Sequence, residues 1–530
     1  MRERPGTVVA ALAAVALVAT GCDAGGGDRG RAAPPAARTS ASPAATRQPP
    51  QRPLPGIPED IAHQRLAWEA CDADDAGPAA STLRPDADCA WLTVPVDYAE
   101  PAGSAIRVRV ARVRAGDRAR RLGSLVLNPG GPGEAGAGMV ASGAFEATAR
   151  VMDRYDLVGF DPRGTGRSQP LRCPQGAGGD LIPRTRAMAE AELHAAAEQG
   201  EKCRRATGPL LAHMDTVSVA RDLDLLRSAL DERALTYLGI SYGTYIGQHY
   251  ARLFPGHVGR FVLDGVVDPG TDQTRTARGD VTSLSDSFAS YARACVEHRC
   301  ALGRTPEEIV STTTEFVRSL DDHPLPGPDG IRLTTGLAAQ GIREPLYQAE
   351  RWPDLTRALL DAMGGRPGAL IGLAVERVRT QGARTDPDES DVDPTMARNA
   401  VECLDKPGPR TAAELLTRMG EFDKASPLFG ATVAAAMFRC AAWPLAPTGR
   451  AEPLTAPGAP PMLLVSYAVD PATPLTNAHT VRKNLGTASL VVREGTGHAA
   501  YASGSECTDR AVEGFLLAGT LPPPDTRCPA

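Results

Sequence analysis

A serine within a glycine-flanked turn is the clearest candidate for chemistry in this 530-residue sequence. Residues 239–243 read Gly-Ile-Ser-Tyr-Gly, after the apolar run 235–240 and before a helix-like segment at 244–254. A strand, a sharp turn and a helix in this order form a nucleophile elbow, which exposes the serine hydroxyl where a base can reach it. We therefore predict that Ser241 is a nucleophile and not simply a small residue in a turn.

A serine nucleophile needs a base and an acid, and two loop residues near the C-terminus meet this need. An imidazole must remove the hydroxyl proton, and a carboxylate must orient that imidazole. His498 lies in a glycine-rich segment after the last apolar run, and Asp470 follows the apolar run before it, whereas His249 and His257 lie in or just after the helix of the elbow. Each could instead be a loop histidine or a capping aspartate, but together they give the order Ser, Asp, His, which is that of α/β-hydrolases.

The same chemistry needs two backbone N–H groups for the oxyanion that forms when Ser241 attacks a carbonyl. We expect one from Tyr242, the residue after the nucleophile. We expect the other from Gly131, in the glycine-rich stretch 128–133 that follows a strand-like run.

The glycine-rich stretch also fits a second interpretation. Gly131, Gly133 and Gly136 match the G-x-G-x-x-G pattern of dinucleotide-binding loops, and Asp156 lies about where a ribose ligand is expected. Pro132 removes one amide from this loop, and the N-terminus described below indicates export away from cytosolic cofactors. We therefore expect no cofactor.

Strands that alternate with helices must position these residues. A helical pattern at 216–230 precedes the strand of the elbow, and such alternation predicts an α/β fold with a mostly parallel sheet. The stretch 271–449 is different, because it favours helices, such as 306–320 and 355–363. It reads as a helical cap inserted between a first core block, 59–270, and a second, 450–530. The strand-like runs are 124–127, 156–160, 235–240, 261–264, 462–466 and 489–492.

The N-terminus predicts export. Arginines precede a twelve-residue apolar stretch at 8–19, which suits a signal peptide over residues 1–21 and is too short to span a bilayer. Small residues directly before Cys22 resemble a lipobox, so Cys22 is a candidate lipid anchor, although a plain secretory signal would also fit. Residues 22–58 are rich in Gly, Pro, Ala, Arg and Ser, which is typical of a disordered tether. The expected location is the outer side of the membrane, with the lipid as the membrane contact, or the medium.

Charge and cysteine content narrow the function further. The net charge of −6 gives no basic footprint for nucleic acid. If Cys22 of the eleven cysteines carries the lipid, an exported chain can pair the other ten into five disulfides, whose order suggests sequential pairs. The chain lacks clustered His/Cys spacing, so we expect no metal site. The ten cysteines are Cys71, Cys89, Cys173, Cys203, Cys295, Cys300, Cys403, Cys440, Cys507 and Cys528.

These features resemble the secreted actinobacterial tripeptidyl aminopeptidases and the related proline-iminopeptidase-like serine exopeptidases of the α/β-hydrolase superfamily. The resemblance covers nearly all of the mature chain. Besides the elbow and the block with Asp470 and His498, it rests on Val-Pro-Val-Asp-Tyr at 94–98, the stretch 128–133, Asp-Pro-Arg-Gly-Thr-Gly-Arg-Ser at 161–168, and the cysteine-containing segments 401–405 and 440–444.

The resemblance implies that Ser241, Asp470 and His498 are nucleophile, acid and base, and that the cap limits substrates to chain ends. One departure is visible, because Glu134-Ala135 stands where the family commonly has Gly and Ser. This carboxylate could bind a substrate amine or face solvent. The other acidic candidates for an amine anchor are Glu344, Glu350, Glu402 and Asp405.

Three functions remain open on the sequence alone. The first is an exported serine exopeptidase that removes residues from peptide N-termini through an acyl-enzyme on Ser241. The second is a carboxylesterase with the same machinery. The third is a surface-binding lipoprotein on an inactive hydrolase scaffold, which usually lacks a triad member, whereas all three candidates are present here.

Overall fold

The structure is a computed structural model that describes residues 56–76, 83–173, 182–382 and 394–530. The predicted signal, Cys22 and most of the predicted tether lie outside these residues. Residues Arg52–Ala530 form one unit. Among the helices of the described ranges, none is both long enough and apolar enough to cross a bilayer.

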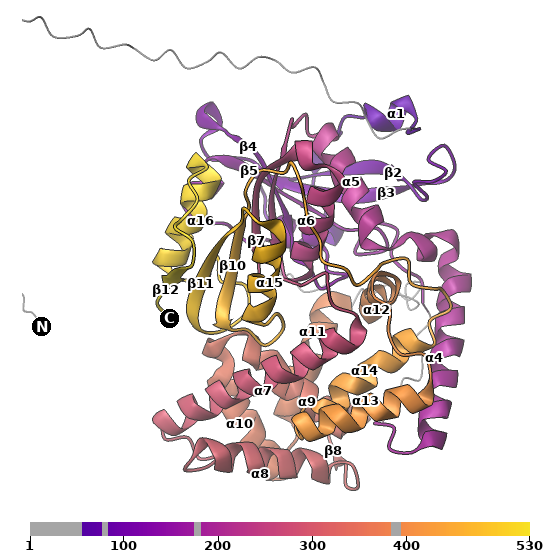
Figure 1. The fold of residues 1–530 in the computed structure, drawn as a ribbon, viewed down its shortest axis with the longest axis vertical. Helices are drawn as coiled ribbons and strands as arrows, with labels where there is room; N and C mark the ends of the chain where they lie inside the picture. Colours follow the sequence, from indigo (N-terminus) through magenta and orange to yellow (C-terminus); the bar gives the residue numbers. More distant parts are fainter. Residues whose placement is uncertain (1–55, 77–82, 174–181, 383–393) are drawn as a thin grey trace, which may run out of the picture. The chain divides into compact units, whose positions relative to one another are not determined.

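A ten-stranded sheet forms the centre of this unit (Figure 1). The strands lie in the order β1-β2-β3-β5-β4-β6-β7-β10-β11-β12, and every pair from β5 to β12 is parallel, whereas β1, β2 and β3 pair antiparallel with each other and β3 with β5. The predicted mostly parallel sheet is thereby confirmed. The bounds are β1 (Glu69–Ala70), β2 (Ala87–Pro95), β3 (Ala105–Val113), β4 (Gly123–Asn128), β5 (Tyr155–Phe160), β6 (Leu235–Ile240), β7 (Val258–Asp264), β10 (Leu463–Val469), β11 (Ser489–Thr496) and β12 (Thr526–Cys528).

The central strands are buried on both faces, which explains their continuous apolar sequences. In β4, Val126 packs into one hydrophobic core while Leu125 and Leu127 pack into the other, because successive side chains of a strand point to opposite faces. Helices α5 (Thr216–Ala229), α6 (Tyr242–Leu253) and α15 (Leu475–Leu485) contribute to the first core. Helices α2 (Gly136–Ser142), α3 (Ala149–Met152) and α16 (Glu506–Ala518) contribute to the second.

The chain between β7 and β10 is helical and gathers at one end of the sheet, in the lower half of Figure 1. Helix α4 (Arg186–Thr207), which precedes this stretch in the first core block, packs against α13 and α14, so we include it among the cap helices. The others are α7 (Gln273–Glu297), α8 (Pro306–Ser319), α9 (Thr335–Arg343), α10 (Trp352–Met363), α11 (Gly368–Gly382), α12 (Pro394–Asp405), α13 (Ala412–Ala425) and α14 (Gly430–Ala441). A short hairpin of β8 (Leu325–Pro326) and β9 (Arg332–Leu333) joins them.

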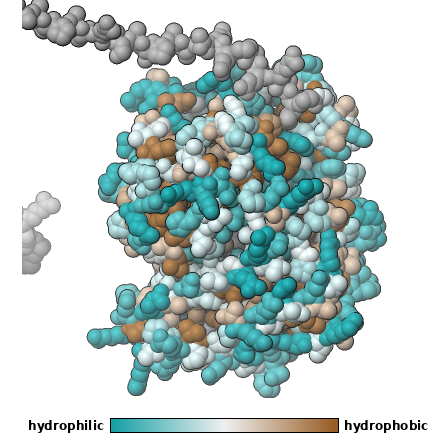
Figure 2. All heavy atoms as spheres, viewed as in Figure 1, coloured by the Kyte–Doolittle hydropathy of each residue, from teal (hydrophilic) through white to brown (hydrophobic). Residues whose placement is uncertain are grey.

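Five disulfides link cysteines that follow one another along the chain. Four of them lie within the core or within the cap, among them Cys403–Cys440, which joins α12 to α14, and Cys173–Cys203 joins the core to α4. The others are Cys71–Cys89, Cys295–Cys300 and Cys507–Cys528. On the face of the described part seen in Figure 2, hydrophobic residues are scattered among hydrophilic ones, which is the pattern of a surface that faces water.

A buried arginine ties the loop after β5 to two other elements. Arg163 is 1% exposed, and its guanidinium donates to Asp222 on α5 at 2.7 and 2.5 Å. It also donates to the carbonyl oxygens of Pro95 and Val96 at 2.9 and 2.8 Å. Because both charges lie in the interior, each depends on the other for its stability.

We expect the substitution Arg163→Met to lower the free energy of unfolding by about 3–5 kcal/mol, because it leaves the Asp222 carboxylate buried without its cation. Denaturant unfolding with the disulfides intact measures this. Arg252→Met is the matched control, since Arg252 pairs with Glu452 at the surface, with side chains 46% and 44% exposed. If Arg252→Met lowered the free energy of unfolding as much as Arg163→Met, burial of the ion pair would not explain the loss.

Candidate active site

Ser241 lies at the turn between β6 and α6 in a strained backbone conformation. Its φ of 55° and ψ of −121° are rare for a residue with a side chain and cost about 1–3 kcal/mol. Hydrogen bonds hold the turn: the Ser241 amide donates to the carbonyl oxygen of Asp264 at 2.8 Å, and the Thr244 hydroxyl donates to the Ser241 carbonyl at 2.6 Å. The half-buried serine is thus presented at the end of the sheet while its backbone is fixed.

The glycine-rich stretch after β4 lies against this elbow with no room for side chains. A Cβ on Gly130 would lie 2.5 Å from the carbonyl oxygen of Ile240 and 2.7 Å from the amide nitrogen of Tyr242. A Cβ on Gly243 would lie 2.4 Å from the carbonyl oxygen of Asn128. The two loops therefore make backbone contact, which brings the stretch that contains Gly131 next to the Tyr242 amide.

His498 and Asp470 form a hydrogen-bonded pair. The His498 Nδ1 lies 2.9 Å from both carboxylate oxygens of Asp470, which is 2% exposed. The amides of Ala472 and Thr473 donate to Asp470 Oδ1 at 2.8 and 2.9 Å, and the Thr473 hydroxyl donates to Oδ2 at 2.9 Å. This fixed carboxylate orients the imidazole and can stabilise its protonated form.

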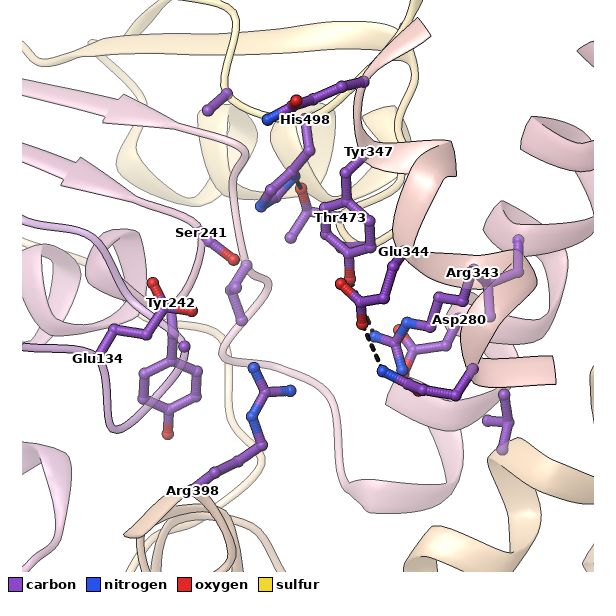
Figure 3. A pocket seen from close by; sticks show the side chains of 18 of the residues that line it. Glu134, Ser241, Tyr242, Asp280, Arg343, Glu344, Tyr347, Arg398, Thr473 and His498 are labelled. Carbon is purple, nitrogen blue, oxygen red and sulfur yellow. Dashed lines mark hydrogen bonds between the residues drawn. The ribbon is translucent and has the colours of Figure 1, made fainter. Parts of the chain in front are cut away.

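A cavity of about 1620 Å³ unites these groups with the cap. Ser241, Tyr242, Gly131 and His498 all line it, and α7, α9, α12 and α14 provide much of the opposite wall. Figure 3 shows His498 above Ser241, with Glu344 and Asp280 across the cavity. The structure therefore brings together the candidate nucleophile, base and oxyanion donors, with Asp470 buried behind the histidine.

Comparison with known proteins places the chain in a family. Residues 123–322 match the model of the alpha/beta hydrolase fold, and residues 426–528 match the model described as TAP-like protein. Serine protease Hip1 of Mycobacterium tuberculosis is 34% identical over 545 residues, which cover 98% of this chain and 96% of that protein. This chain belongs to the TAP-like α/β-hydrolases. The predicted fold and the resemblance are both confirmed.

Two further relatives of this TAP-like hydrolase have different names. Carboxylesterase B of Mycobacterium tuberculosis is 34% identical over 517 residues, covering 94% of this chain and 95% of the relative. Tripeptidyl aminopeptidase of Streptomyces lividans is 31% identical over 487 residues, covering 87% of this chain and 86% of the relative.

The dinucleotide interpretation of the glycine-rich stretch does not fit the fold. Asp156 pairs with Ser124 near the beginning of two parallel strands, whereas the glycines follow the end of β4. Asp156 and the glycines therefore lie at opposite ends of these strands. The Asp156 carboxylate instead accepts from the Ala115 amide and the Arg121 guanidinium at 2.9 and 2.8 Å. It is a structural residue.

Asp264, which the sequence analysis did not select, connects the elbow to the histidine loop. Its carbonyl oxygen accepts from the Ser241 amide, and its carboxylate accepts from the amides of Ala500 and Tyr501 at 3.0 and 2.8 Å. Burial raises the pKa of this carboxyl. The sequence could have indicated Asp264, because an aspartate at the end of an apolar strand lies at the same end of a parallel sheet as Ser241.

The cap contacts the histidine loop directly. The His498 amide donates to the carbonyl oxygen of Tyr347 at 3.1 Å, and the two rings meet edge to face with centroids 5.3 Å apart. Gln348 and Gly497 form an antiparallel bridge next to this contact. Nothing in the sequence around Tyr347 indicates this role, because the contact depends on how the cap folds back.

The structure narrows the set of acidic residues that could bind an amine. Glu134, Glu344, Glu350 and Glu402 line the cavity. Asp405 is absent from the cavity wall, because its buried carboxylate accepts hydrogen bonds from Thr216 and Tyr242, so its selection as an amine anchor is wrong. Asp280, which the sequence analysis missed, lines the cavity on α7, and burial raises its pKa to about 6.

We expect Asp264→Asn to reduce turnover of a hydrolase substrate by about 10- to 100-fold, because the amide group of asparagine cannot accept from both N–H groups and the histidine loop shifts. Steady-state kinetics with a chromogenic ester measure this. Asp268→Asn is the control, since within the described part of the chain the Asp268 side chain accepts only from the nearby amide of Gly270, and asparagine can replace it. Equal activity of the two variants would exclude the proposed effect of Asp264.

Proposed function

We propose that this TAP-like hydrolase is an exported serine exopeptidase that hydrolyses peptides from their N-termini. The observation that carries the proposal is the joint position of Ser241 and His498 in one cavity that the cap helices close on its far side. The names of two relatives, Serine protease Hip1 and Tripeptidyl aminopeptidase, support peptide hydrolysis.

The reaction proceeds through an acyl-enzyme. His498 Nε2 takes the proton of the Ser241 hydroxyl as the oxygen attacks the peptide carbonyl, while the Asp470 carboxylate stabilises the imidazolium through Nδ1. The amides of Gly131 and Tyr242 donate to the oxyanion of the tetrahedral intermediate. The imidazolium then protonates the leaving amine as the C–N bond breaks. Water, deprotonated by His498, hydrolyses the ester and restores Ser241.

The size of the cavity supports a peptide substrate. At about 1620 Å³ it exceeds the roughly 300–1,000 Å³ of ordinary small-molecule sites, so it can hold several residues. The cap helices lie across the cavity from Ser241 (Figure 3). We infer that the cap blocks one direction along the peptide, so that one end of the substrate lies inside the cavity.

An acidic pair on the cap can receive the terminal amine. Asp280 on α7 and Glu402 on α12 both line the cavity, and the negative charge of Glu402 contributes to the raised pKa of Asp280. Arg343, Arg398 and Lys406 oppose this effect without removing it. A substrate ammonium between the two carboxylates would relieve their repulsion. We propose this pair as the amine site.

Export and anchoring complete the proposal. Five disulfides are typical of proteins outside the cytosol. Together with the apolar segment 8–19, the disulfides support export by a signal over residues 1–21. The proposed tether at 22–58 begins at a lipidated Cys22, and secretion without the lipid is the alternative. We retain 59–270 and 450–530 as the core and 271–449 as the cap, with α4 added to the cap.

A carboxylesterase is the second candidate, because a relative of equal identity is named Carboxylesterase B. An inactive binding protein is the third. Peptide and ester substrates separate the first two, since only an aminopeptidase requires a free α-amine, and a covalent probe separates both from the third.

We expect Ser241→Ala to abolish labelling by a fluorophosphonate probe and to lower peptide hydrolysis by about 10⁵-fold or more, because no other group can form the acyl-enzyme. Gel fluorescence and release of a chromogenic amine from tripeptide amides measure the two effects. Ser290→Ala on α7, outside the cavity, should retain both. Full hydrolysis by Ser241→Ala, or no labelling of the wild type, would exclude the proposed function.

The amine site predicts a pH dependence of KM. Asp280 is charged above about pH 6 and neutral below it, so KM for peptides with a free N-terminus should rise as the pH falls through that value. Asp280→Asn should raise this KM by about 10-fold at pH 7.5, through loss of a charge-assisted contact, and flatten its pH dependence. N-acetylated substrates should show neither change.

Glu350→Gln is the matched control for Asp280→Asn, because Glu350 lines the same cavity on a different cap segment. A larger KM effect in Glu350→Gln than in Asp280→Asn would assign the amine to Glu350. Unchanged KM in both variants would exclude these two carboxylates as the anchor.

A further inference from the structure

A buried hydrogen-bond cluster lies next to the elbow, around the hydroxyl of Tyr242. Asp405, the last residue of α12, is 3% exposed. Its carboxylate accepts from the amide and the hydroxyl of Thr216 at 2.9 and 2.6 Å, and from the Tyr242 hydroxyl at 2.5 Å. One carboxylate of the cap thus joins the first residue of α5 to the first residue of α6.

Tyr242 is the residue that supplies an oxyanion donor in the proposed mechanism. Its amide faces the glycine-rich stretch, since a Cβ on Gly130 would lie only 2.7 Å from it. Its side chain is buried against the ring of Tyr245 at a centroid distance of 5.1 Å, and its hydroxyl donates to Asp405. The hydrogen bond at the far end of the ring therefore restrains rotation of the whole residue.

Asp405 is itself held in place. The adjacent disulfide Cys403–Cys440 joins α12 to α14, and the amides of Thr448 and Gly449 donate to the Leu404 carbonyl at 2.8 and 2.9 Å. A Cβ on Gly449 would lie 2.0 Å from the Asp405 carbonyl oxygen, so the backbone packs closely here. A carboxylate on such a support can fix the position of its partner.

Burial and hydrogen bonding act in opposite directions on the protonation of this carboxylate. Burial raises the pKa of Asp405 to about 7 and Asp215 adds to the rise, while the hydrogen bonds from Thr216 and Tyr242 lower it and so favour the ionised form. Lys406, the next residue, is also buried and donates to hydroxyls of α7 and the segment before it.

We propose that Asp405 is a positioning residue that holds Tyr242, and with it one oxyanion donor, from the cap. The inference rests on the proposed function, because it concerns the oxyanion site of the same reaction. By this inference the cap positions an oxyanion donor in addition to selecting substrates. A purely structural tie between cap and core would instead affect how peptides bind and leave the chemistry of a small ester unchanged.

The test uses Tyr242→Phe, which removes only the hydroxyl, and Asp405→Asn, each assayed with p-nitrophenyl acetate, a substrate too small to reach the cap. We expect kcat to fall by about 10-fold in each variant with KM within about threefold, because the oxyanion donor is displaced but not removed. The double variant should fall no further than the singles, because both remove the same interaction. Tyr245→Phe, a buried tyrosine that does not bond to Asp405, should keep its kcat.

Thermal unfolding verifies that each variant is folded, and if Asp405→Asn is not, Tyr242→Phe decides alone. Unchanged kcat for the ester in Tyr242→Phe, with a raised KM for peptides, would overturn the proposal in favour of a structural tie. Additive losses in the double variant would also overturn it. Fluorophosphonate labelling of the wild type distinguishes failure of this inference from failure of the proposed function. If the wild type is labelled and Tyr242→Phe is unaffected, only this inference is refuted. If the wild type is not labelled, the proposed function is refuted.

Discussion

The backbone contact between the glycine-rich stretch and the elbow is the constraint on which the site depends. Gly130 and Gly243 allow the two loops to approach within distances that any side chain would prevent. Only in this contact can the amide of Tyr242 and the stretch with Gly131 face one point, beside a serine held in a strained conformation. The parallel sheet makes the contact possible, because the ends of β4 and β6 lie side by side.

Core and cap are joined at the site by hydrogen bonds and not only by apolar packing. Tyr347 accepts from the His498 amide, and Asp405 accepts from the Tyr242 hydroxyl. Asp264, at the end of β7, links the elbow to the histidine loop. The base and the oxyanion loop are thus each supported by residues that come from distant parts of the chain.

Sequence patterns predicted the parts of the site that depend on local geometry. Ser241, Asp470 and His498 each follow a strand-like run, and parallel strands bring their ends to one edge, so their placement could be inferred. The spacing of Glu402 and Asp405 on one helix could not show that the first faces the cavity and the second the core. The position of Asp280 in the cavity could not be predicted, because nothing in the neighbouring sequence distinguishes it from a surface carboxylate on a helix. The packing of α4 against the cap could not be predicted either, because it depends on contacts between distant segments.

The sequential disulfides bear on how the chain matures. Each bridge spans a short stretch, from 5 residues at Cys295–Cys300 to 37 at Cys403–Cys440. A chain that emerges N-terminus first therefore presents both members of every pair before the first cysteine of the next pair appears. Pairing each cysteine with the next one to emerge would give the same five bridges that the structure contains.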